Sequence, residues 1–253
     1  MGEKRLTSAW RAPTLCRSGN EVGGGPSEAD PSVRVRVKIC GITRPEWAVA
    51  AADAGADAIG LVFADSPRQV SPDEAAEIVR ALPPWVAPVG VFVDEPAASI
   101  CEIAERVGLH AAQLHGDEPP EAVGELAPLK VVKALRIGGE KDVQRAHAWR
   151  EACRRLGREP DAYLVDAKVT GGPKGGTGRP ADWDLAARLA LEGFRPLILS
   201  GGLSADNVAE AIRHVRPWGV DASSGLETAP GRKDPDRIRA FIEAVRGIGQ
   251  GAG

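Results

Sequence analysis

The sequence has few aromatic side chains: Phe, Trp and Tyr make up 4% of its 253 residues, and Met occurs once. Its core must therefore consist mainly of Val, Ile, Leu and Ala. The sequence also lacks any uninterrupted apolar run of about 18 residues, which excludes a transmembrane helix. The net charge is only −3 at pH 7, and this near balance argues against a dedicated nucleic-acid-binding protein.

Cysteine is equally scarce, with four residues that lie far apart: Cys16, Cys40, Cys101 and Cys153. No C-x-x-C pair occurs, so the spacing that a structural zinc site needs is absent. A disulfide framework is typical of small secreted domains rather than of a chain of this length and cysteine spacing. Cysteine usage therefore indicates a reducing compartment, and we expect a cytoplasmic protein.

The chain divides by composition into three parts. Residues 1–32 show no persistent apolar period and contain the linker-like stretch 23–27, so we expect a flexible, disordered N-terminal extension. Residues 33–247 are expected to form one folded domain. Residues 248–253 are expected to be a flexible tail.

Strand-like and helix-like segments alternate after residue 33. The strand-like runs are mostly apolar throughout, which is typical of parallel strands buried on both faces. Ser71, Pro72 and Glu74 match a capping box, and Gly55, Gly108 and Gly247 follow predicted helices. Ser204 is expected to cap another helix. The predicted strands are 33–39, 58–63, 89–93, 111–114, 131–135, 162–165, 196–199 and 219–222; the helices with clear end signals are 45–54, 73–82, 96–107, 205–214 and 235–246.

Eight repeats of a strand followed by a helix predict an α/β fold, a (β/α)₈ TIM barrel, in a single domain. A doubly wound parallel sheet is the alternative. That fold usually has fewer strands and a glycine-rich dinucleotide-binding turn after its first strand. Here the first strand is followed by Cys40-Gly41-Ile42-Thr43, and the glycine-rich turns occur late in the chain, which favours the barrel.

In such a barrel the active site lies at the carboxyl ends of the strands. Cys40 directly follows the first predicted strand, and Lys38, two residues earlier, points to the same face. A nearby ammonium group lowers the pKa of a thiol, so we expect Cys40 to have enough thiolate character to act as a base or nucleophile. The alternative is a small buried side chain that only fills space.

Asp166 directly follows the sixth predicted strand. A carboxyl group in a partly apolar site can act as a general acid, although an isolated Asp at a strand end often only caps the following loop. A thiolate base and a carboxylic acid on opposite sides of a barrel mouth would suit an isomerase that moves protons.

Three late turns are rich in Gly or Ser and follow consecutive strands: residues 175–178, 201–204 and 223–225. Backbone N–H groups exposed by glycine bind anions, and the loops after strands seven and eight commonly bind phosphate in these barrels. Each turn alone could be ordinary turn chemistry, but together they predict a phosphate site. Residues 171–175, with Lys174, would form either a lid or an ordinary solvated loop.

A series of motifs in one order carries a family resemblance. They are residues 38–43, 60–63, 66–68, 89–93, 113–118, 164–166, 175–178, 199–203 with Asn207, and 219–227. In these segments the chain resembles phosphoribosylanthranilate isomerase, a family of tryptophan biosynthesis. The resemblance covers residues 35 to about 246.

The resemblance implies an Amadori rearrangement of N-(5-phosphoribosyl)anthranilate to 1-(2-carboxyphenylamino)-1-deoxyribulose 5-phosphate. It implies Asp166 as the general acid, Cys40 as the general base and Arg68 as the partner of the anthranilate carboxylate. The phosphate would be held by Gly178, Gly201, Gly202, Ser224 and Gly225. The implied substrate is a small phosphosugar, without a metal or organic cofactor, a nucleic acid or a membrane, and the protein would be a monomer or homodimer.

Lys38, His115 and Asp221 are further candidate site residues. His115 belongs to a family-like motif, but a structural hydrogen bond would explain it equally well. Asp221 lies inside the last strand and is more suited to orienting its neighbours than to proton transfer. Glu227 is expected to satisfy loop backbone or a nearby cation.

Three other functions remain open at this stage. A Schiff-base aldolase on the same barrel would need an inward lysine, for which Lys133 is the candidate, although an ion-paired lysine fits as well. A histidine-pathway isomerase would use paired aspartates on strands one and five, which Cys40 at the end of strand one argues against. A non-catalytic phosphate-binding module would keep the glycine turns without needing both Cys40 and Asp166.

Overall fold

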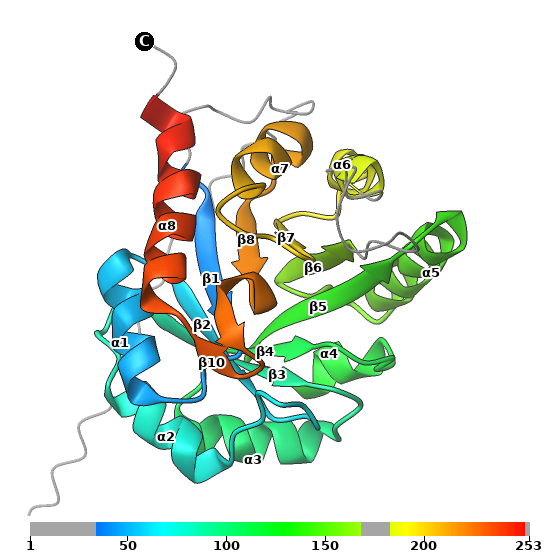
Figure 1. Ribbon diagram of the computed structural model, residues 1–253. Helices are drawn as coiled ribbons and strands as arrows, with labels where there is room; N and C mark the ends of the chain where they lie inside the picture. The colour runs from blue at the N-terminus through cyan, green and yellow to red at the C-terminus, as the bar shows by residue number, and fades with distance from the viewer. Residues whose placement is uncertain (1–33, 168–182, 251–253) are drawn as a thin grey trace, which may run out of the picture. The chain divides into compact units, whose positions relative to one another are not determined.

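The computed structural model describes residues 34–167 and 183–250, which form a closed barrel of eight parallel strands surrounded by helices (Figure 1). The strands neighbour one another in chain order, and β1 pairs with β8 to close the ring. This confirms the predicted (β/α)₈ fold and excludes the open sheet. The barrel strands are β1 Arg36–Cys40, β2 Ala58–Val62, β3 Ala87–Phe92, β4 Ala111–Leu114, β5 Lys130–Ile137, β6 Ala162–Ala167, β7 Leu197–Ser200 and β8 Gly219–Ala222.

Helices follow the strands and pack their apolar faces on the outside of the barrel. Buried aliphatic side chains such as Ile39, Ile59 and Leu61 fill the layer between strands and helices. None of the helices among the described residues is long and apolar enough to cross a membrane. The helices are α1 Pro45–Ala54, α2 Pro72–Arg80, α3 Ala97–Val107, α4 Glu121–Glu125, α5 Glu140–Arg155, α6 Trp183–Leu191, α7 Val208–Val215 and α8 Pro235–Arg246, with short 3-10 helices at η1 Ser224–Leu226 and η2 Gly247–Gln250.

Local sequence signals set most helix ends as predicted. Ser71 and Glu74 form the reciprocal capping box of α2, and the Ser71 backbone N–H donates to Glu74 Oε2 over 2.8 Å. Gly55 and Gly108 end α1 and α3 in the left-handed conformation, with φ of 100° and 78°. Helices α1 and α8 have the predicted bounds.

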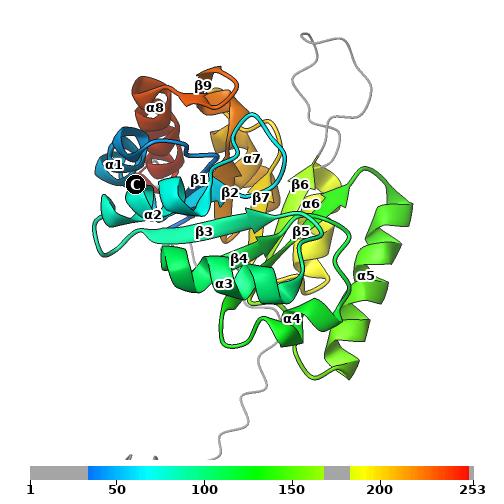
Figure 2. The same ribbon diagram turned by 90° about the horizontal axis from the view of Figure 1, so that it is seen from below.

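Several elements begin or end one or two residues away from the predicted positions, and three differences are larger. β1 begins at Arg36 rather than at residue 33. α7 begins at Val208 after Asn207, not at 205 after Ser204, because the Asn207 side chain accepts a hydrogen bond from the Ser204 backbone N–H and holds 204–207 in a turn. A two-stranded hairpin, β9 Glu227–Ala229 and β10 Arg232–Lys233, was not predicted; Figure 2 shows β9 beside the start of α8.

A cluster around Glu159 holds α5 against β6 at the amino-terminal end of the strands. The Glu159 carboxylate accepts hydrogen bonds from Arg150 (2.7 Å), Arg154 (2.8 Å) and the Tyr163 hydroxyl (2.9 Å). Burial acts to raise the pKa of Glu159, but these hydrogen bonds outweigh it and lower the pKa from 4.5 to about 2. The cluster therefore stabilises the fold while Glu159 is ionised.

Replacing Glu159 with Gln is expected to destabilise the protein by roughly 1–2 kcal/mol at neutral pH, since the site is partly exposed. Because the folded-state pKa is depressed, this contribution is fully present above the unfolded pKa near 4.5 and is lost as the pH falls towards 2. Urea unfolding of both proteins at several pH values checks this. A stability difference that stays constant from pH 7 to pH 3 would contradict it.

Candidate functional site

Polar side chains collect at the carboxyl ends of the barrel strands, where this fold builds its active sites. Cys40 is the last residue of β1, and Ser200 is the last residue of β7. Asp166 lies one residue before the end of β6, and its Cα pairs in register with that of Ser200. The predicted base and acid thus lie on β1 and β6, with β7 and β8 between them in the ring.

Gly60 on the neighbouring strand β2 makes room for the side chains of Cys40 and Lys38. A β-carbon at Gly60 would lie 2.7 Å from Cys40 Sγ and 3.0 Å from Lys38 Nζ. Both groups therefore fill the space that a larger residue would occupy. Lys38 and Cys40 face the same side of β1, as their spacing predicted.

Lys38 forms a buried ion pair with Asp221 on the neighbouring strand β8. Its Nζ donates to Asp221 Oδ1 over 2.8 Å, and both side chains are less than a tenth exposed. The Ser200 hydroxyl donates to the other oxygen, Asp221 Oδ2, over 3.2 Å. Asp221 therefore orients its neighbours, as expected, and connects β1, β8 and β7.

The electrostatic effect on Cys40 is opposite to the one expected. Burial raises the pKa of the Cys40 thiol, and although Lys38 lowers it, the net direction is upward. The expectation of a depressed thiol pKa is therefore wrong. The physical reason is that Lys38 is paired with Asp221, whose negative charge also raises the pKa of the thiol, so burial dominates.

Asp166 faces His115 across the mouth. His115 Nε2 lies 3.9 Å from Asp166 Oδ2, and His115 Nδ1 lies 2.8 Å from Gln113 Nε2. Burial lowers the pKa of His115 against the opposing effect of Asp166, which favours the neutral form of the imidazole. The hydrogen bond to Gln113, which is 1% exposed, gives His115 a structural role that fixes its ring.

The candidate phosphate loops after β7 and β8 meet one another. Gly201 and Gly202 have φ of 103° and 64°, a backbone conformation that favours glycine. A β-carbon at Gly225 would collide with the Leu203 carbonyl oxygen, so the two loops approach closely there. Ser224 begins the short helix η1. Gly178, the fifth predicted phosphate residue, lies outside the described residues, as do Lys174 and the rest of segment 171–175, for which a lid and an ordinary loop were the two alternatives.

Arg68 is held by a carboxylate of the protein. Its Nε and Nη2 donate to Glu227 Oε1 and Oε2 over 2.8 and 2.6 Å. The Arg68 side chain is 23% exposed, and the hydrogen bonds to Glu227 raise its pKa. Glu227 therefore satisfies a nearby cation, as the sequence predicted.

Lys133, the candidate Schiff-base lysine, is ion-paired. Its Nζ lies 2.5 Å from Glu118 Oε2 and donates to the Gly116 carbonyl oxygen over 2.8 Å. It also lies 5.6 Å from the centre of the Trp149 ring. These contacts favour the ion-paired interpretation of Lys133 over the aldolase one.

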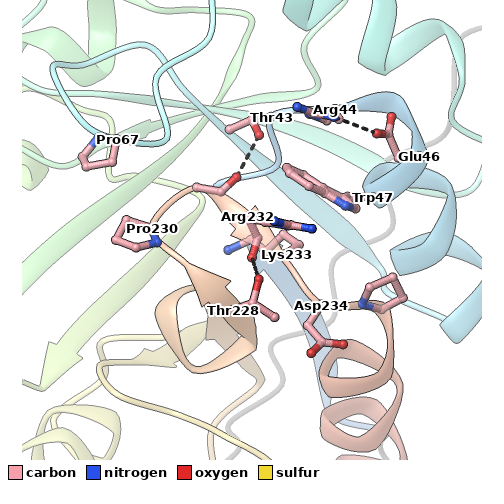
Figure 3. A pocket seen from close by; sticks show the side chains of 12 residues that line it. Thr43, Arg44, Glu46, Trp47, Pro67, Thr228, Pro230, Arg232, Lys233 and Asp234 are labelled. Carbon is pink, nitrogen blue, oxygen red and sulfur yellow. Dashed lines mark hydrogen bonds and ion pairs between the residues drawn. The ribbon is translucent and has the colours of Figure 1, made fainter.

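A pocket of about 700 Å³ lies beside the barrel mouth, between the β1–α1 segment and the β9–β10 hairpin (Figure 3). Thr43 closes one side by donating to the Gly231 carbonyl oxygen over 3.0 Å. Cys40 and Asp166 do not line this pocket. Within the described ranges, no three His, Cys, Asp or Glu side chains are grouped so as to hold a metal ion.

Sequence reasoning missed roles for Gly60, Ser200, Gln113 and Lys233. Gly60, Gln113 and Ser200 lie in family-like motifs, so their positions carried a signal without a chemical role. Lys233 carried no such signal, because it lies on the hairpin that the sequence did not predict.

Comparison with known proteins finds a family model that matches most of the chain. The model of N-(5'phosphoribosyl)anthranilate (PRA) isomerase matches residues 37–244. The chain is 46% identical over 213 residues to the N-(5'-phosphoribosyl)anthranilate isomerase of Pelobacter propionicus, covering 84% of this chain and 96% of the relative. It is 47% identical over 214 residues to that of Geobacter sulfurreducens, covering 84% and 99%.

Solved structures agree. The crystal structure of phosphoribosyl anthranilate isomerase from Thermotoga maritima superposes with a TM-score of 0.74 at 44% identity, over 84% of this chain and 99% of that one. A phosphoribosyl anthranilate isomerase in complex with reduced 1-(o-carboxyphenylamino)-1-deoxyribulose 5-phosphate gives 0.73 at 42% identity, with the same coverage.

Proposed function

The chain belongs to the N-(5'-phosphoribosyl)anthranilate isomerase family and is an isomerase of tryptophan biosynthesis, and we propose that Asp166 and Cys40 perform its acid–base chemistry. The observation that carries this proposal is their placement at the carboxyl ends of β6 and β1. A general acid and a general base at one barrel mouth can each serve a different atom of the same bound sugar.

In the proposed reaction Asp166 protonates the furanose ring oxygen of N-(5-phosphoribosyl)anthranilate, and the C1′–O bond breaks to give an open-chain Schiff base. The Cys40 thiolate then removes the C2′ proton, forming an enolamine. Tautomerisation adds a proton at C1′ and turns the C2′ hydroxyl into a ketone. The reaction is an internal oxidation and reduction of the aldose–ketose type: C2′ is oxidised, C1′ is reduced, and no proton is gained or lost overall.

The two ends of the substrate would be bound by different parts of the mouth. The loops after β7 and β8, with Gly201, Gly202, Ser224 and Gly225, offer backbone N–H groups to the phosphate. Gly178 completes this proposed set. The planar fork of Arg68 suits the anthranilate carboxylate. Lys38 and Asp221 would neutralise each other's charge beside Cys40 and hold their side chains in place at the base of the site.

The cellular location, the oligomeric state and the terminal segments of the enzyme are also open to proposal. We propose a cytoplasmic protein that acts as a monomer or homodimer. A crystal structure that is 40% identical in sequence is described as that of generated monomers of the dimeric phosphoribosylanthranilate isomerase from Thermotoga maritima, which supports including the dimer. We propose further that residues 1–32 and 248–253 lie outside the catalytic domain.

Purified protein is expected to consume N-(5-phosphoribosyl)anthranilate, which can be followed by the change in anthranilate fluorescence. It is also expected to restore growth of a tryptophan auxotroph that lacks this isomerase. An aldolase of the same fold would instead be trapped by borohydride on Lys133 in the presence of an aldehyde substrate. Binding of the product without any turnover would contradict the proposed function and favour a binding module.

A further inference from the structure

Two charged side chains behind Arg68 have no role in the reaction as proposed so far: Glu227 and Lys233. Glu227 begins β9 and Lys233 ends β10, so the hairpin brings them to the same place. The Lys233 side chain has no exposed surface, and that of Glu227 is 4% exposed. Burying opposite charges costs desolvation free energy and seldom stabilises a fold more than apolar packing would, so their position calls for another explanation.

Lys233 uses its donors inside the protein. Its Nζ donates to Glu227 Oε1 over 2.7 Å, to the Ser223 carbonyl oxygen over 3.1 Å and to the Ser223 hydroxyl over 3.3 Å. An ammonium group has three N–H donors, so these contacts occupy them all. Although Lys233 lines the pocket in Figure 3, its contacts tie the start of the β8 phosphate loop to Glu227.

Glu227 in turn fixes the plane of Arg68. The two parallel hydrogen bonds from Nε and Nη2 leave the guanidinium one orientation, with Nη1 outside the pair. The Arg68 stem lies over Gly41, the residue after Cys40, where a β-carbon would collide with it. The oriented guanidinium is therefore set beside the proposed base.

The charges of Arg68, Glu227 and Lys233 do not cancel. Arg68 and Lys233 share one carboxylate, which leaves an excess positive charge at a half-buried position, and an anion would neutralise it. Glu227 is ionised, since hydrogen bonds from Arg68 and Lys233 lower its pKa against the opposing effect of burial. The group thus favours a negatively charged ligand at Arg68.

We propose that Glu227 and Lys233 are positioning residues that hold Arg68 in the orientation that receives the substrate carboxylate. Through Ser223, Lys233 also links that orientation to the phosphate loop, so the sites for the two anionic ends of the substrate are built as one unit. This inference rests on the proposed role of Arg68.

The test is a double-mutant cycle with Arg68→Ala, Glu227→Gln and the combination of both. The KM and kcat for N-(5-phosphoribosyl)anthranilate are measured, together with the Kd of reduced 1-(2-carboxyphenylamino)-1-deoxyribulose 5-phosphate. Glu227→Gln is expected to raise KM and Kd by roughly ten- to hundred-fold, with a smaller change in kcat. In the Arg68→Ala background the same substitution is expected to have little further effect.

Glu159→Gln is the matched control, because Glu159 also holds two charged side chains, Arg150 and Arg154, but lies at the other end of the barrel. It is expected to leave KM unchanged. Should Glu227→Gln fail to fold because Lys233 is left buried without a partner, Glu227→Gln combined with Lys233→Met removes both charges. That folded variant is expected to show the same rise in KM.

The outcomes separate the inference from its premise. An unchanged KM in Arg68→Ala would overturn the proposed role of Arg68 and the inference with it. A raised KM in Arg68→Ala, but wild-type binding by a folded Glu227 variant, would overturn only the inference. Fully additive effects in the combined variant would overturn it as well, since Glu227 would then act independently of Arg68.

Discussion

Replacing Asp166 with Asn is expected to lower kcat by roughly 10²–10⁴-fold, the usual contribution of a general acid. The amide has nearly the shape of the carboxyl group but cannot deliver a proton to the ring oxygen. Asp166 is about a fifth exposed at the end of β6, so the substitution leaves the buried barrel layers intact. Steady-state kinetics of the purified variant measure the loss of kcat, and a circular-dichroism melting curve shows whether the fold is intact.

Asp161→Asn is the matched control for this loss. Asp161 immediately precedes β6 at the opposite end, where it pairs with Lys130 over 2.7 Å. We expect that variant to retain kcat, although it loses an ion pair. Near-normal turnover by a folded Asp166→Asn variant would show that Asp166 is not the general acid. His115, which lies 3.9 Å from Asp166, would then be the next candidate for that role.

Most of the fold could be predicted because its signals are local. Continuous apolar runs mark strands buried on both faces, and helix ends such as Ser71 with Glu74 or Gly55 need only neighbouring residues. The β9–β10 hairpin escaped prediction because its strands have three and two residues and no apolar alternation. Contacts with distant parts of the chain hold it in place: Glu227 binds Arg68, 159 residues away, and the Gly231 carbonyl oxygen accepts from Thr43, 188 residues away.

The sequence predicted where the candidate catalytic residues lie, but not the charges around them or the direction of the pKa shift of Cys40. The strand-end rule located Cys40 and Asp166, and the spacing of two residues brought Lys38 to Cys40. The sequence could not reveal that Lys38 pairs with Asp221, 183 residues away, or that burial outweighs the lysine and raises the pKa of the thiol. Both facts depend on barrel closure, which joins β1 to β8.

Replacing Cys40 with Ala or Ser is expected to lower kcat by roughly 10²–10⁴-fold, because neither side chain offers a base for the C2′ proton near neutral pH. Alanine also leaves a small void over Gly60, so each variant's melting temperature is compared with the wild type. Cys153→Ala is the matched control: it removes another buried thiol, on α5 and away from the mouth, and should leave kcat unchanged.

The pH dependence of the wild type distinguishes a thiolate base from a thiol that only packs. A base must be deprotonated, and burial raises the pKa of Cys40 above its ordinary value, so the ionised fraction of the free enzyme increases on the alkaline side of neutrality. The ratio kcat/KM, which reports the free enzyme, is therefore expected to rise with pH above 7. In Cys40→Ala this rise should disappear while the residual activity persists. A folded Cys40→Ala variant that keeps both wild-type turnover and the alkaline rise would show that the proton is removed by another group.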